Sequence, residues 1–167
     1  MSVSGSIATL TDYDLEVYLE GTQARLAAGG VVQVSYDFGP GAPELTDNRV
    51  GVGTNRAVAR FDDLVVEQLV GGSPSPPSTA LPYSEGYGDG SADYLHVTAG
   101  TWRVTGGRFQ ATPSSGGDGY ALLQSSGPLP SKLKLSSLIN ADTSADAMVV
   151  FDYQDPDNYR FAGASLG

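Results

Sequence analysis

Apolar and polar side chains alternate along several short segments of this chain, and a period of two residues predicts β-strands with one buried face. In residues 12–20 the odd positions are apolar, and all but one of the even positions are acidic. Residues 31–38 repeat the alternation, and Gly39-Pro40-Gly41 ends it because neither residue type sustains a ladder of hydrogen bonds. We expect a half-buried strand in each of these two segments.

A β-hairpin is predicted around the dipeptide Gly106-Gly107. The segments Trp102-Arg103-Val104 and Arg108-Phe109-Gln110-Ala111 flank this turn with strand-forming residues. A two-residue loop at the glycines places Val104 opposite Phe109 on the same face of the hairpin.

The remaining strands differ in how their apolar residues are arranged. Residues 132–135 alternate lysine with leucine, whereas residues 147–153 are apolar on both faces, as in a central strand covered on two sides. Further strand candidates are 4–11, 49–53, 56–69, 83–87, 119–125 and 159–166. The nearest candidate for a helix, 22–28, is short and bounded by glycines. About a dozen strands are too many for one open sheet, so we expect an all-β protein with two packed antiparallel sheets.

Composition permits one globular domain and disfavours some partners. A chain of 167 residues with 40% hydrophobic residues can bury one sizeable core. The formal charge of −10 repels phosphate backbones and anionic membranes, so no nucleic-acid partner is expected. The surplus of carboxylates suits either Ca²⁺, which prefers oxygen ligands, or simply a soluble surface. There is no cysteine, and no apolar run is long enough to insert into a membrane.

Four groups of residues together resemble the concanavalin A-like (laminin G-like, lectin/glucanase) jelly-roll superfamily. They are residues 100–107, residues 149–161, residues 13–17 with Glu20-Gly21, and residues 51–54 with 61–64. The resemblance implies an all-β, two-sheet antiparallel jelly-roll sandwich, but it carries little information about function.

The order of these segments is reversed relative to such modules. By the resemblance, residues 1–70 correspond to the C-terminal half of a module, 71–82 to a Pro/Ser linker, and 83–167 to the N-terminal half. One interpretation is a circularly permuted single sandwich over residues 1–167. The other is a pair of half-modules that complete each other between molecules, which gives a swapped oligomer instead of a monomer.

A bulge is predicted at Asp62-Asp63, because Ala59 and Phe61 fall in one register of the alternation whereas Leu64 and Val66 fall in the other. In the sandwich modules that this chain resembles, a closing-strand Asp commonly joins the opening strand in a structural calcium site. The resemblance therefore implies Asp63 and Glu85 as Ca²⁺ ligands, with Asp62 as the alternative ligand. The other interpretation is an exposed acidic pair without metal. A second acidic segment, Asp155-Pro156-Asp157-Asn158, is first of all a turn sequence.

Aromatic side chains are the expected glycan contacts, because their flat faces stack on sugar C–H surfaces. The candidates are Tyr87, Tyr94, Trp102, Tyr120 and Tyr159. Most aromatic residues in a sandwich belong to its core, and Trp102, which alternates with Val104, is favoured as a core residue over a binding platform.

Catalysis finds little support in the sequence. The glucanases of the superfamily carry a Glu-x-Asp-x-x-Glu strand, which this chain lacks, and its single histidine, His96, has no identifiable catalytic partner. We therefore expect a non-catalytic glycan-binding or adhesion module of a bacterial extracellular protein, stabilised by Ca²⁺ and bound to a polysaccharide or cell-surface glycan. Its secretion signal is expected to lie outside this chain. The alternatives are a structural module that links subunits by exchanging half-domains and, with less weight, a glycoside hydrolase.

Overall fold

The computed structural model describes residues 11–46, 49–56, 58–71, 81–112, 117–124, 129–142 and 146–165. Within these ranges there are thirteen strands and no helix, and all strand pairings are antiparallel. No described residues form a helix long and apolar enough to cross a membrane. The two-sheet, all-β fold expected from the alternation is confirmed, and it is compatible with a jelly roll.

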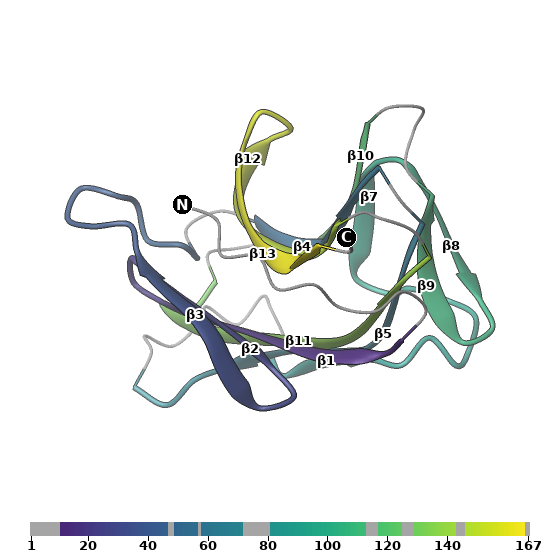
Figure 1. Cartoon of the computed structure of the whole chain (residues 1–167), viewed down its shortest axis with the longest axis horizontal. Coiled ribbons are helices and arrows are strands. Elements are labelled where there is room, and N and C mark those ends of the chain that lie inside the picture. The colour runs from purple at the N-terminus through teal and green to yellow at the C-terminus, as the bar shows by residue number, and fades with distance from the viewer. Residues whose placement is uncertain are drawn as a thin grey trace.

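The larger sheet has eight strands, seven of them in one continuous order (Figure 1). That order is β3 (Val31–Asp37), β2 (Gln23–Ala28), β1 (Tyr13–Glu20), β11 (Lys132–Ala141), β5 (Ala59–Gln68), β9 (Arg108–Thr112) and β8 (Thr101–Thr105). The short β6 (Tyr83–Glu85) pairs with β5 beside this path.

The smaller sheet has five strands and packs against the larger one. Its order is β13 (Asn158–Ser165), β12 (Asp146–Asp155), β4 (Arg49–Asn55), β10 (Asp118–Leu123) and β7 (Leu95–Ala99). Figure 1 shows β12 and β10 rising on either side of β4, away from the larger sheet.

The main core consists of the alternate apolar side chains that the two sheets direct toward each other. From the larger sheet these include Leu15, Val17, Leu19, Phe61, Leu133 and Leu135, and from the smaller one Val50, Val52, Ala121, Val149 and Phe151. Burial of these side chains is the main favourable free energy that holds the two sheets together.

Several local predictions are confirmed by the register of the strands. Val104 lies opposite Phe109 in the hairpin of β8 and β9. The register of β5 against β11 shifts at Asp62-Asp63, and Asp63 has φ 47°, which confirms the bulge. Strand β12 lies inside its sheet and is buried from Ala147 to Tyr153, as its apolar run indicated.

Strand β3 exists where predicted, but the expectation that it is half-buried is wrong. Val31 and Val32 are 62% and 55% exposed, and Tyr36 is exposed as well. β3 is the outermost strand of the larger sheet, and six of its seven residues are exposed on both faces. Residues 22–28, the nearest helix candidate, contain β2. The strand predicted for 4–11 lies outside the described residues except for Thr11, and so does most of the linker, 72–80.

Both sheets contain strands from either side of the linker. In the larger sheet, β5 pairs with β6, β9 and β11, and Val66 lies opposite Tyr83. In the smaller sheet, β4 lies between β10 and β12. The two parts of the chain thus form one interleaved pair of sheets.

Candidate functional site

The smaller sheet is apolar on both faces, including the face directed away from the larger sheet. Five buried side chains form a second cluster there, separate from the main core, with Tyr159 and Ala99 packed against it. The five are Tyr120, Leu122, Met148, Val150 and Tyr153. We call the outward surface made by Tyr120, Tyr153 and Tyr159, with the neighbouring Asn55 and Asp118, the aromatic face.

The aromatic face is brought together by strong curvature of the sheet. Strands β13 and β10 are separated by β12 and β4, which corresponds to about 14 Å at the usual spacing of strands. Nevertheless, the ring centroids of Tyr159 and Tyr120 are 5.0 Å apart, and those of Tyr153 and Tyr120 are 5.4 Å apart. The sheet rises on either side of β4 (Figure 1), and the ring distances show that tyrosines from the two sides pack against each other.

Strand β4 contributes glycines at the middle of this face. A Cβ placed on Gly53 would lie 3.0 Å from Cγ2 of Val150 and 3.1 Å from Cδ1 of Tyr120. The side chains of Val150 and Tyr120 therefore occupy the space above Gly53 that the side chain of a larger residue would need. The absence of side chains at Gly51 and Gly53 lets the residues of β10 and β12 converge.

Asp118 forms the polar end of the aromatic face. Its carboxylate accepts hydrogen bonds from the Asn55 amide, from the Tyr120 hydroxyl and, at 3.4 Å, from the Tyr159 hydroxyl. Burial raises the pKa of both tyrosine hydroxyls, and the bond to Asp118 raises the pKa of Tyr120 further. Both hydroxyls therefore remain protonated donors at neutral pH.

A cation completes the surroundings of these rings. The Arg49 guanidinium lies 5.0 Å from the centroid of the Tyr153 ring, within the range of a cation–π interaction. Aromatic rings, a carboxylate, an amide and a guanidinium thus occur together on one outward face. A few convergent polar groups among aromatic side chains are typical of a site for a small polar ligand.

The sequence indicated part of this site. Tyr120 and Tyr159 were expected glycan contacts, and the structure brings them together, although Tyr120 is only 1% exposed. Tyr153 was missed because it ended an apolar run that was interpreted as core. Asp118 and Asn55 were missed too. The signal for Asp118 is its position two residues before Tyr120, which places both side chains on the same face of β10.

The other expected aromatic contacts lie elsewhere. Tyr87 belongs to the main core and stacks on Phe109, with ring centroids 5.4 Å apart, so it lies apart from the cluster of Tyr120. Trp102 packs on Phe109 at 4.7 Å and donates a hydrogen bond to the Ala99 carbonyl, which is the core role that its alternation favoured. Tyr94 is 64% exposed and outside the aromatic face, with its ring edge against Tyr83.

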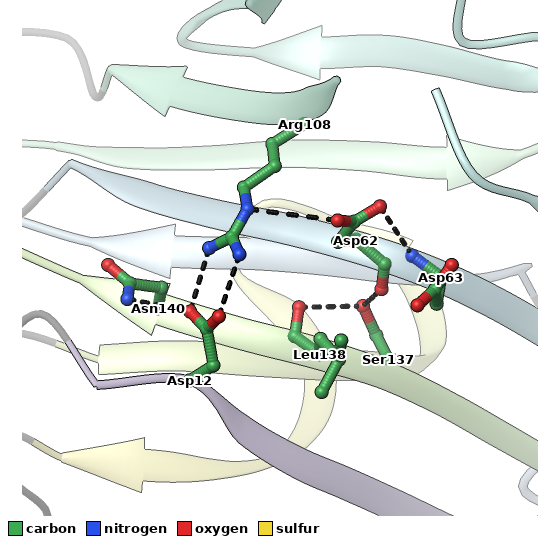
Figure 2. A network of polar contacts seen from close by, with 7 residues as sticks. All are labelled: Asp12, Asp62, Asp63, Arg108, Ser137, Leu138 and Asn140. Carbon is green, nitrogen blue, oxygen red and sulfur yellow. Dashed lines mark hydrogen bonds and ion pairs between the residues drawn. The ribbon is translucent and has the colours of Figure 1, made fainter. Parts of the chain in front are cut away.

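Asp62, one of the expected calcium ligands, belongs to a network on the larger sheet (Figure 2). One oxygen accepts a hydrogen bond from its neighbour's backbone, Asp63 N–H, at 2.9 Å, and the other lies 3.7 Å from Nε of Arg108. Arg108 in turn donates two hydrogen bonds of 2.7 Å to Asp12. Asp62 therefore has a structural role that connects β5 with β9.

Glu85, the second expected ligand, organises the loop that follows β6. Its carboxylate accepts hydrogen bonds from Tyr87 N–H at 2.9 Å, from Asp93 N–H at 3.1 Å and from the Tyr83 hydroxyl at 3.4 Å. These donors surround both oxygens with partial positive charge, which fits a cation poorly.

Asp63 is placed differently from the other two carboxylates. A Cβ built on Gly86 would lie 3.7 Å from Oδ1 of Asp63, so the Asp63 carboxylate points toward the backbone that follows β6. Among the described residues, this carboxylate accepts no hydrogen bond. Within those residues, no three His, Cys, Asp or Glu side chains gather in a way that could hold a metal ion. A calcium ion would thus have Asp63 as its carboxylate and would otherwise depend on backbone oxygens and water.

The second acidic segment is a turn, as its sequence indicated. The Asp155 carboxylate accepts hydrogen bonds from Asp157 N–H and from the Asn158 amide, all of 2.9–3.0 Å, between β12 and β13. These hydrogen bonds lower the pKa of Asp155.

Comparison of the sequence with known proteins gave no match, either to a protein-family model or to a curated protein.

Proposed function

We propose that this protein is a non-catalytic, concanavalin A-like module of a bacterial extracellular or cell-surface protein, and that it binds a glycan at the aromatic face. The supporting observation is the convergence of three tyrosine rings with the Asp118 carboxylate and the Asn55 amide on one outward surface. The two-sheet, antiparallel fold is compatible with this class of module.

The chemistry of the aromatic face suits a neutral sugar. Tyrosine rings present flat apolar faces to the C–H groups of a pyranose, while a carboxylate and an amide pair with its hydroxyls. The formal charge of −10 repels acidic polysaccharides, so uncharged glycans are the proposed class.

A screen of immobilised neutral oligosaccharides tests this proposal. The intact protein is expected to bind at least one of them, and Asp118→Asn is expected to weaken that binding by about tenfold, the effect of losing one charge-assisted hydrogen bond. Asp89→Asn is the matched control, because Asp89 is exposed and contacts Ser91 in a loop between β6 and β7. Retained folding is checked by circular dichroism. Absence of binding by the intact protein, or equal binding by both variants, contradicts the proposal.

We also propose a structural Ca²⁺ site at Asp63, supported by the direction of its carboxylate toward Gly86 at the bulge. A bound ion stabilises only the folded state, so Ca²⁺ at a hundred times its dissociation constant is expected to raise the melting temperature by about 5–10 °C. Thermal melts with Ca²⁺ and with EGTA, on the intact protein and on Asp63→Asn, measure this shift. An identical melting temperature in Ca²⁺ and EGTA eliminates the calcium site.

We keep one alternative function, a structural module that links subunits, because strands on either side of the linker pair with each other. The pairs β1–β11, β5–β6 and β4–β10 all connect the two parts of the chain across the linker. The same pairs can form between two copies, which would link subunits by exchange of half-domains. Light scattering separates the two cases, because a self-contained module has a molar mass of 17.3 kDa and an exchanged dimer has twice that value.

A further inference from the structure

The hairpin formed by the ends of β12 and β13 is weakly connected to the rest of the smaller sheet. β12 pairs with β4 without interruption from Asp146 to Val150, but beyond the bulge at Asp152 only Tyr153 still lies opposite a β4 residue, Arg49. We call residues 152–160 the arm. Figure 1 shows the arm as the curved loop at the end of β12, rising beside β4.

The base of the arm is fixed. Asp152 is buried and has φ 49°, which bends β12 at the bulge. The Arg160 guanidinium lies 3.3 Å from the Asp152 carboxylate and 4.1 Å from the centroid of the Phe38 ring, so this end is attached to the segment that follows β3.

The tip of the arm, by contrast, is held through its tyrosines. Residues 154–158 are all exposed, whereas Tyr153 and Tyr159 pack their rings on Tyr120, and the Tyr159 hydroxyl donates to Asp118. Two ring contacts with Tyr120, the cation–π contact of Arg49 with Tyr153 and a long hydrogen bond are weak compared with the main core. Segments with few buried contacts open locally without unfolding of the whole molecule.

The closed arm also occupies the proposed binding surface. Tyr120 is only 1% exposed, and the rings nearest to it are those of Tyr153 and Tyr159. A sugar cannot stack on the Tyr120 ring while the Tyr159 ring lies 5.0 Å from it. Any ligand that stacks on the Tyr120 ring must therefore displace the arm.

We propose that the arm is a hinged cover, with Asp152 as its hinge, that closes the aromatic face by placing the Tyr159 ring where a sugar ring binds on Tyr120. This inference depends on the proposed function for the identity of the ligand, but the hinge itself does not. If only open molecules bind, the apparent dissociation constant equals the intrinsic one divided by the fraction of molecules that are open. A smaller open fraction therefore gives weaker apparent binding. The arm thus sets the affinity and selects ligands able to replace a tyrosine ring.

Nitration of tyrosines by tetranitromethane, followed by peptide mass spectrometry, measures the opening without any glycan. Tyr87 is the internal control, because it is as buried as Tyr120, its pKa is likewise raised by burial, and it stacks in the main core instead of under the arm. In the intact protein, Tyr120 and Tyr153 are expected to react at least about tenfold faster than Tyr87, because they need only local opening.

Two variants separate the cover from general loosening of the fold. Tyr159→Phe keeps the ring and removes its bond to Asp118, so nitration of Tyr153 is expected to accelerate by about threefold or more while Tyr87 is unchanged. Tyr83→Phe is the matched control, since it removes a tyrosine hydroxyl that donates to the Asp93 carbonyl and to Glu85, away from the arm, and should leave the Tyr153 rate unaltered.

Equal nitration rates for Tyr120, Tyr153 and Tyr87 in the intact protein, or no acceleration of Tyr153 in Tyr159→Phe, would overturn the hinged cover. A glycan screen without a single hit would instead contradict the proposed function and leave the nitration result standing. The two failures are therefore distinguishable.

Discussion

Single side chains connect strands of the larger sheet that are far apart in the sequence. Arg108 of β9 donates to Asp12, which precedes β1, and Asp12 also accepts a hydrogen bond of 2.9 Å from the Asn140 amide of β11 (Figure 2). The bonds from Arg108 and Asn140 lower the pKa of Asp12 to about 2, because they favour the ionised carboxylate. This network stabilises the folded state only while Asp12 is charged.

The lowered pKa predicts how stability depends on acid. Because the folded pKa of Asp12 is about 2 and its ordinary value is 3.8, the contribution of Asp12 is complete above pH 3.8 and is lost as the pH falls toward 2. Asp12→Asn is expected to lower the free energy of unfolding by about 1 kcal/mol at neutral pH, as for a partly exposed ion pair. Urea titrations of both proteins across this pH range measure the difference. A difference that stays constant down to pH 2 contradicts this account of Asp12.

Two aspartates with positive φ bend their strands, and only one of them was predictable. At Asp63 the alternation of apolar positions changes register, so the bulge is visible in the sequence. At Asp152 the preceding residues are apolar on both faces of the strand, so there is no alternation whose register could change at a bulge. The bend that brings Tyr153 and Tyr159 onto Tyr120 was therefore not detectable from the local sequence.

At the scale of elements, a glycine in β4 allows β10 to approach closely. A Cβ placed on Gly51 would lie 2.2 Å from the Ala121 carbonyl oxygen, a backbone atom that no change of rotamer can move. The close approach of β4 and β10 therefore requires glycine at position 51.

Gly51→Ala is accordingly expected to lower the free energy of unfolding by about 3 kcal/mol, because β10 must shift away from β4. Gly88→Ala is the matched control, since a Cβ there meets nothing within 4 Å and the residue has no positive φ. Urea titrations of the two variants provide the comparison. Equal stabilities would show that β4 and β10 do not approach as closely as described.

Alternation predicted the positions of strands better than their surroundings. The register of β8 against β9 followed from a two-residue turn, and the central position of β12 from its continuous apolar run. The exposure of β3 did not follow, because burial depends on which layer lies opposite a strand and not on the strand itself. For the same reason the aromatic face was only partly foreseen: its residues come from β4, β10, β12 and β13, and they meet through curvature.

At the scale of the whole molecule, the described parts on either side of the linker depend on each other. β4 and β5 each lie between strands from beyond the linker. Without the second part, the first keeps only the β3-β2-β1 portion of the larger sheet, and β4 and β5 lose their partners on both sides. The apolar faces of both parts would therefore be exposed if they were separated.

The fragments 1–71 and 81–167 are therefore expected to be largely unfolded alone and to regain β-structure when mixed, whereas the intact chain unfolds in one cooperative transition. Circular dichroism of each fragment, of their mixture and of the intact protein tests this expectation. A cooperative thermal transition in either isolated fragment would show that it folds around its own core.

The most direct test of the account is to locate the bound glycan by NMR, using isotope-labelled protein and the tightest-binding neutral oligosaccharide from the screen. Binding at the aromatic face is expected to shift the signals of Asn55, Asp118, Tyr120 and Tyr159, and to leave those of Tyr94 and of the Asp12 network unchanged. Shifts confined to Tyr94 or to the larger sheet, with the signals of Tyr120 and Tyr159 unaffected at a saturating concentration, would contradict it.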